Sequence, residues 1–129
     1  MIESDTGDKT VLIIDDDPDF RAATRLVLEH AGFLVGEASD GREGLEAARR
    51  ANPDAILLDL MMENVDAGSR VSLELKEAGG GCPVFLVSSA GDAVRYNLDP
   101  GELGLAGIFQ KPIDNTVLIR TLKRELKVP

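Results

Sequence analysis

The stretch VLIIDDDPDF, residues 11–20, decides the fold and poses a chemical problem. Its four leading apolar residues are typical of a strand that is buried on both faces. They run directly into Asp15, Asp16 and Asp17, whose adjacent carboxylates repel one another unless solvation or a cation offsets the cost. Asp17 followed by Pro18 is typical of the N-cap and the first position of a helix. The stretch therefore predicts a buried strand, an acidic turn and a helix.

The helix that begins at Pro18 is expected to continue to about His30 and to stop at Gly32. Its apolar residues recur at helical spacing and predict one buried face. The residues assigned to that face are Phe20, Ala23, Val27 and Leu28.

Strand and helix patterns alternate along the rest of the chain. Asp99-Pro100-Gly101 interrupts the pattern within residues 92–107, where the alternation requires another helix. Five strands that alternate with helices predict an α/β fold, in which a parallel sheet carries helices on both faces. Further strands are predicted within residues 33–39, 55–60, 83–89 and 107–111, and further helices over residues 41–52, 69–78 and 115–126.

Composition narrows the possible functions. The chain has 129 residues, 43% of them hydrophobic, which suits one domain with a real core. A net charge of −9 argues against a nucleic-acid partner and against docking on an anionic membrane. Cys82 is the single cysteine, so no intrachain disulfide can form. No apolar run approaches the ~20 residues of a membrane span, and the polar residues 1–8 resemble no signal peptide, so we expect a cytoplasmic protein with a disordered lead.

Reactive residue types occur where the predicted strands end. Asp15 and Asp16 follow the first strand, Asp59 closes the third, Ser88 the fourth and Lys111 the fifth. The carboxyl ends of parallel strands meet at one edge of a sheet, where such folds place their functional sites. The acids would form a pocket of hard oxygen ligands suited to Mg²⁺. With the metal, the lysine and the serine could bind a phosphoryl group, and one carboxylate could accept it.

Four motifs, in this order and at this spacing, resemble the receiver domain of two-component response regulators, in particular stand-alone receivers of the chemotaxis type. They are VLIIDDDPDFR, PDAILLDLMMENVDAG, PVFLVSSA and QKPID. The resemblance extends over Thr10 to Leu126 and implies a flavodoxin-like three-layer sandwich, with strand order 2-1-3-4-5 and about five helices. It places the receiver domain at residues 9–127, after a lead of residues 1–8.

The resemblance also implies a role for each site residue. Asp59 matches the phosphoacceptor, which also binds the metal. Asp16 matches the acid that binds Mg²⁺ directly, and Asp15 matches its neighbour, which acts through a metal-bound water. The remaining matches are Met61, whose backbone carbonyl would bind the metal, Ser88, whose hydroxyl would move to the phosphoryl oxygen, and Lys111, which precedes a typically cis Pro112 and would pair with the phosphoryl group.

The implied function is phosphotransfer. A histidine kinase or a phosphotransfer protein would donate a phosphoryl group to Asp59 in the presence of Mg²⁺, and the change would alter binding of an unknown downstream protein. Because the chain ends soon after the last predicted helix, we expect a stand-alone receiver, monomeric or weakly dimeric. Met61 and Ala90 cannot position a water through side-chain hydrogen bonds, so self-dephosphorylation is expected to be slow.

Departures from the family pattern motivate an alternative. Glu63 stands where the family has a proline, and Ile108 where it has an aromatic residue. The alternative is a receiver-fold adaptor that binds partners without phosphorylation. A metal-dependent phosphatase would need a second acid two residues after Asp59, where Met61 stands. A flavin-binding protein would need a phosphate loop after the first strand, where the acids would repel the FMN phosphate.

Overall fold

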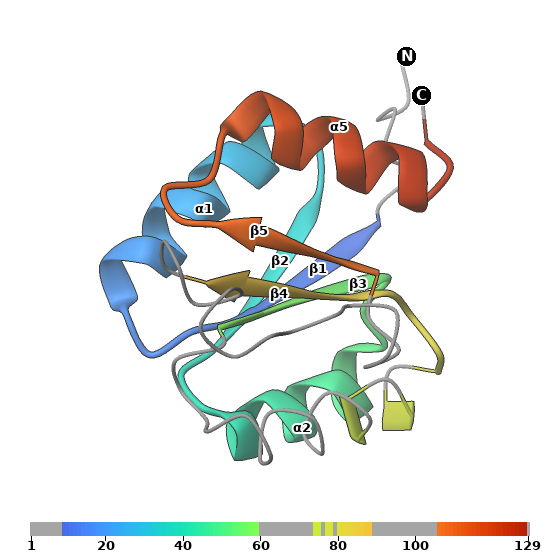
Figure 1. Cartoon of the computed structure of the whole chain (residues 1–129). Coiled ribbons are helices and arrows are strands. Elements are labelled where there is room, and N and C mark those ends of the chain that lie inside the picture. The colour runs from blue at the N-terminus through green and yellow to red at the C-terminus, as the bar shows by residue number, and fades with distance from the viewer. Residues whose placement is uncertain (1–8, 60–73, 76, 79, 89–105, 129) are drawn as a thin grey trace.

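The computed structural model contains a five-stranded parallel sheet in the order β2-β1-β3-β4-β5 (Figure 1). It describes residues 9–59, 74–75, 77–78, 80–88 and 106–128. This order confirms the predicted flavodoxin-like topology. The strands are β1 (Thr10–Ile14), β2 (Leu34–Ala38), β3 (Ala55–Asp59), β4 (Val84–Ser88) and β5 (Gly107–Gln110).

Helices cover both faces of the sheet, as predicted for a three-layer fold. Helices α1 (Pro18–His30) and α5 (Asn115–Glu125) lie on one face, and α2 (Gly41–Ala51) lies on the other (Figure 1). Residues 74–75 and 77–78, from the predicted helix over 69–78, are helical. The irregular segment at 92–107 lies outside the described residues up to position 105. No helix in the described part of the chain has the length and apolar character needed to cross a membrane.

Successive side chains of the central strands point to opposite faces of the sheet, so the core consists of two apolar clusters, one on each face. In β1, Leu12 and Ile14 face α2, whereas Val11 and Ile13 face α1 and α5. Every residue of β3 and β4 is buried, as expected for strands covered on both faces. Each large apolar side chain buried in this way contributes about 1.5–3 kcal/mol. The polar residues at the strand ends therefore follow directly on strands that are packed in the apolar core.

Helix α1 begins and ends where the sequence predicts. The Asp17 side chain accepts a hydrogen bond from the backbone N–H of Asp19 at 2.9 Å, and Pro18 opens the helix. The helix ends at His30, and Gly32 follows with φ of 100°, a left-handed conformation that favours glycine. Asp17 thus caps the helix, as predicted from its position before a proline.

The buried face of α1 differs in one position from the prediction. Ala23 is exposed, whereas Thr24 is buried. Phe20, Thr24 and Leu28 recur at intervals of four, and this row faces the sheet. Ala23 lines a groove of about 530 Å³ between α1 and the start of α5, together with Phe20, Thr24 and Val27. Hydrophobicity alone favoured Ala23 for the buried face, whereas the four-residue spacing from Phe20 to Leu28 puts Thr24 there.

Helix α2 approaches the sheet closely because its inner face consists of small residues. Gly44, Ala47 and Ala48 are all buried. A Cβ atom added to Gly44 would lie 2.5 Å from Cδ1 and 3.0 Å from Cγ1 of Ile14. Ile14 is fully buried, and its branched side chain is stiff, so it has little room to move.

Gly44→Val is therefore expected to lower the free energy of unfolding by about 1–3 kcal/mol, since the new side chain overpacks the interface with Ile14. Denaturant unfolding followed by circular dichroism measures the change. Glu46→Val places the same side chain on the exposed face of α2 and serves as the matched control. Equal losses for the two variants would mean that valine in a helix, not the close approach, is responsible.

Candidate functional site

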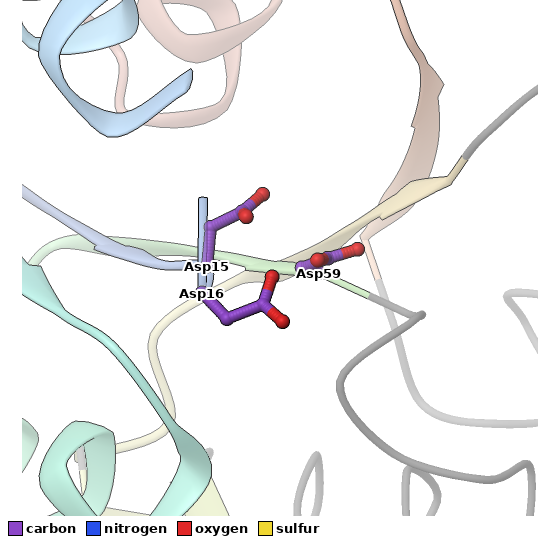
Figure 2. Close-up of side chains that lie close together, drawn as sticks. All are labelled: Asp15, Asp16 and Asp59. Carbon is purple, nitrogen blue, oxygen red and sulfur yellow. The ribbon is translucent and has the colours of Figure 1, made fainter. Parts of the chain in front are cut away.

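Three carboxylates gather at the carboxyl edge of the sheet (Figure 2). Ile14 pairs with Leu58 in register, so Asp15, directly after β1, and Asp59, at the end of β3, come side by side. One carboxylate oxygen from each of Asp15, Asp16 and Asp59 lies within 4.8 Å of the other two. Asp15 and Asp59 are buried, and Asp16 is exposed and points toward Asp59 (Figure 2). The structure thus brings together the three acids that the sequence predicted.

Asp15 is held in place through its backbone and its side chain. Its N–H donates to the carbonyl of Ala38 at 3.1 Å, which extends the β1–β2 pairing by one residue. Its Oδ1 accepts a hydrogen bond from the N–H of Asp17 at 2.9 Å. Its carbonyl oxygen accepts one from Nη1 of Arg21 at 2.6 Å. With Oδ1 already engaged, Asp15 is less available as a direct metal ligand than the exposed Asp16.

Lys111 follows β5 and reaches the same carboxylates. Its Nζ lies 2.9 Å from Oδ2 of Asp15 and 4.0 Å from Oδ2 of Asp59. The ammonium also lies over the ring of Phe20, 4.3 Å from the ring centroid, a cation–π arrangement. The peptide bond between Lys111 and Pro112 is cis, as the resemblance implies. The lysine therefore approaches the acids from β5, the outermost strand on that side of the sheet.

Burial and charge act in opposite directions on Lys111. Removal from water disfavours the ammonium form and by itself lowers its pKa. Contact with Asp15 and the negative charges of Asp59 and Asp15 outweigh burial, so the pKa lies above the ordinary value of 10.5. Lys111 is consequently a permanent positive charge at neutral pH.

Ser88 is the last residue of β4 and is buried, with 2% of its surface exposed. Asp59 pairs with Val87 in register, which places Ser88 one residue beyond the acid on the neighbouring strand. The Ser88 carbonyl accepts a hydrogen bond from the N–H of Lys111 at 2.7 Å. The serine and the lysine thus end adjacent strands at the same edge as the acids. The remaining predicted site residue, Met61, lies outside the described residues, as do Glu63 and Ala90.

Ile108 and Phe109 point to opposite faces of the sheet. Ile108 packs against the apolar cluster on the α2 face. Phe109 belongs to the cluster on the α1 and α5 face, where its ring centroid lies 5.3 Å from that of Phe85. Ile108 thus puts an aliphatic side chain at the position where receivers usually carry an aromatic residue. The aromatic residue that follows it, Phe109, is buried in the core on the opposite face.

The chemistry of this donor set fits a divalent cation. Three carboxylates and the ammonium of Lys111 give this group of side chains a formal charge of −2, and two of the acids are buried. Buried like charges at this separation are unfavourable unless a counter-ion is present. Carboxylate oxygens with room for waters are the ligands that Mg²⁺ prefers. Asp15, Asp16 and Asp59 are the residues that would hold it.

A family model, the response regulator receiver domain, matches residues 11–123. The chain belongs to this family. The described residues of the predicted site lie at the carboxyl edge of the sheet, where an open α/β sheet places its functional site.

Curated relatives and solved structures agree with this assignment. The transcriptional regulatory protein CseB of Streptomyces avermitilis is 35% identical over 117 residues, which cover 91% of the receiver and 48% of CseB. A Francisella response regulator receiver domain superposes with a TM-score of 0.78 at 26% identity, covering 92% of this chain and 97% of that one. The chemotaxis response regulator CheY4 of Vibrio cholerae gives 0.74 at 27% identity, with coverage of 91% and 98%. The receiver spans about half the length of the curated relatives it matches.

The structure adds two site neighbours that sequence reasoning missed. Arg21 of α1 contacts the backbone of Asp15, and Phe20 of α1 lies against the ammonium of Lys111. Arg21 also bonds Glu37 of β2 at 3.0 Å. A helix residue that contacts a strand end depends on how the helix crosses the sheet, so no local motif indicates either role.

Glu37 joins the two arginines of α1. Its Oε1 accepts from Nε of Arg21 at 3.0 Å, and its Oε2 accepts from Nη1 of Arg25 at 2.7 Å. The hydrogen bond from Arg25 is the main cause that lowers the pKa of Glu37 below its ordinary value of 4.5. Burial opposes this effect, and the hydrogen bond from Arg21 adds to it. The charged form of Glu37 is therefore favoured by folding.

Because the pKa of Glu37 is lower in the folded state, its charge stabilises the fold above pH 4.5, and this contribution disappears as the pH falls through the folded pKa. Glu37→Gln is expected to lower the free energy of unfolding at pH 7 by about 0.2–1 kcal/mol, the range for partly exposed ion pairs. The difference from wild type should shrink below pH 4.5. Denaturant unfolding at several pH values measures it, and a difference that does not change with pH would contradict this account.

Proposed function

We propose that the receiver accepts a phosphoryl group on a carboxylate oxygen of Asp59, donated by the phosphohistidine of a histidine kinase or a phosphotransfer protein. The observation that carries the proposal is the convergence of Asp15, Asp16, Asp59 and Lys111 at one sheet edge, in a chain that belongs to the receiver family. An Asp59 oxygen attacks phosphorus, a P–O bond forms, and the P–N bond to the donor imidazole breaks. A proton from solvent neutralises the departing imidazole nitrogen.

The residues around Asp59 prepare this transfer by position and charge. Mg²⁺, when bound by Asp15, Asp16 and Asp59, would neutralise charge on the phosphoryl oxygens. Lys111 lies 4.0 Å from Oδ2 of Asp59 and would pair with a phosphoryl oxygen once the group is attached. Ser88 would donate its hydroxyl hydrogen to another oxygen.

Several finer assignments rest on the resemblance and belong to this proposal. The backbone carbonyl of Met61 would complete the metal site, with Asp15 acting through a water. Met61 and Ala90 cannot orient a hydrolytic water, so the acyl phosphate on Asp59 should be lost slowly. We propose that this chemistry takes place in the cytoplasm. The named relatives are transcriptional regulators about twice as long as this chain. Their role in transcription is not part of the function proposed for this receiver.

One observation favours a second candidate, an adaptor that binds partners without phosphorylation. Ile108 occupies the position at which receivers carry an aromatic residue, and it packs onto the α2-face cluster. The adjacent Phe109 is buried against Phe85. A phosphorylation signal would therefore lack the usual aromatic partner of Ser88. An adaptor would bind its downstream protein equally well when Asp59 cannot be phosphorylated.

The test of phosphotransfer is intact mass spectrometry after incubation with a small acyl phosphate, with Mg²⁺ or with a chelator. One added phosphoryl group, present only with Mg²⁺ and lost on treatment with hydroxylamine, is the expected result for an aspartyl phosphate. Absence of any adduct in a preparation that binds Mg²⁺, also with a phosphohistidine donor, would overturn the proposal and favour the adaptor.

A further inference from the structure

Arg21 joins the acidic turn to the rest of the fold. It lies in the first turns of α1, with 18% of its side chain exposed. Its Nη1 donates to the carbonyl oxygen of Asp15 at 2.6 Å, and its Nε donates to Oε1 of Glu37 at 3.0 Å. One planar guanidinium therefore connects α1, the end of β1 and the middle of β2.

The Asp15 carbonyl is the oxygen of the peptide bond that links Asp15 to Asp16. A donor fixed on this oxygen fixes the plane of that peptide, and with it the direction in which Asp16 leaves the turn. The N–H of Asp15 is already bound by Ala38, and Oδ1 of Asp15 by the N–H of Asp17. Of these bonds, the one from Arg21 is made by a side chain outside the turn. It therefore acts directly on the Asp15–Asp16 peptide, whereas Ala38 binds the preceding N–H and Lys111 contacts the Asp15 side chain.

Glu37 holds the guanidinium in turn. Its second oxygen accepts from Nη1 of Arg25 at 2.7 Å, so Glu37 is fixed from two sides. The order of contacts runs from Arg25 to Glu37, to Arg21, and then to the Asp15 carbonyl. Only Arg21 touches the acidic turn in this series, which separates its effect on the turn from its effect on stability.

We propose that Arg21 is a positioning residue for the metal site. It aims Asp16 at the ion by holding the Asp15–Asp16 peptide, and it acts by geometry, not by charge. This inference rests on the proposed function, because it presumes that the acids bind Mg²⁺. A positive charge by itself weakens binding of a cation, so any gain in affinity from Arg21 must come from the orientation it imposes.

Arg21→Lys tests the geometry at constant charge. A lysine ammonium is a single point on a flexible stem and does not reproduce the fork that joins Glu37 to the Asp15 carbonyl. Isothermal titration calorimetry with MgCl₂ should show a dissociation constant about 10-fold weaker than that of wild type, the lower end of the range for residues that orient metal ligands. Arg25→Lys is the matched control, since it disturbs the same Glu37 network without touching Asp15, and its dissociation constant should change much less than that of Arg21→Lys.

A second measurement does not require metal. Hydrogen exchange of the Asp17 amide in metal-free protein should be faster in Arg21→Lys than in Arg25→Lys, because a looser Asp15 peptide also loosens the bond from Asp17 to Asp15. Denaturant unfolding of both variants shows whether their overall stabilities match.

The outcomes separate this inference from the proposed function. If wild type binds Mg²⁺ and both lysine variants bind it equally well, the positioning role is wrong and the proposed function stands. Equal weakening in the two variants also overturns the role, because loss of the network as a whole would then explain it. If wild type binds no Mg²⁺, the positioning role and the metal-dependent function both fail.

Discussion

Asp59→Asn is expected to abolish the phosphoryl adduct that wild type forms with Mg²⁺ and an acyl phosphate. The amide oxygen carries no negative charge and is a poor nucleophile, so it cannot form the acyl phosphate. The substitution preserves shape at a position that is 4% exposed, and it removes one of three mutually repelling charges. The variant should therefore fold at least as stably as wild type without metal. Intact mass spectrometry measures the adduct, and thermal unfolding measures the stability.

Asp19→Asn is the control for this experiment. Asp19 is an exposed acid in the first turn of α1, near the same end of the sheet, and its side chain is not part of the carboxylate cluster. It should be phosphorylated like wild type. An adduct of wild-type yield on Asp59→Asn would mean that another carboxylate, with Asp16 the nearest exposed one, is the acceptor.

Asp16→Asn is expected to remove the stabilisation of the fold by Mg²⁺. A ligand that binds only the folded state raises the free energy of unfolding by about 2.7 kcal/mol at 100 times its dissociation constant. Asp16 is exposed and directed at Asp59, so it can coordinate the ion without a structural role of its own (Figure 2). Thermal unfolding at increasing MgCl₂ should show a rising midpoint for wild type and a constant one for the variant. Without metal, the variant should melt at the same temperature as wild type or higher, because one repulsive charge is gone.

Asp17→Asn separates coordination from general negative charge. Asp17 is the neighbouring residue and caps α1, and asparagine caps a helix about as well as aspartate. The control variant therefore loses the same charge but keeps the site. Its melting temperature should still rise with MgCl₂, and loss of that response would show that diffuse attraction to the acidic turn, not ligation by Asp16, stabilises the protein.

The part of the site that lies on strand ends could be predicted from sequence. Continuous apolar runs identify β1 and β3 in the sequence, and the parallel sheet then brings Asp15 and Asp59 together whatever the details of packing. The cap at Asp17 followed from the two residues Asp17 and Pro18 alone. Lys111 was placed by the same rule, because β5 ends at that edge.

The contacts made by α1 could not be predicted in this way. Whether Phe20 lies over Lys111, or Arg21 over the Asp15 carbonyl, depends on the angle at which the helix crosses the sheet. That angle is set by packing of many side chains and has no local signature. The burial of Thr24 in place of Ala23 has the same origin, because hydrophobicity alone does not tell which residues of a helix meet the sheet.

The order of the site residues along the chain has a consequence for synthesis. Asp15 and Asp16 follow β1 and Asp59 ends β3, all in the first half of the chain, whereas Lys111 follows β5. At bacterial or eukaryotic translation rates, roughly 3 to 10 s separate the appearance of Asp59 from that of Lys111. A nascent chain that pairs β1 with β3 in this interval places its acids together before their lysine exists. Water or a free divalent cation must then offset the repulsion between the carboxylates. The nascent chain therefore needs a counter-charge for its acids before Lys111 has been synthesised.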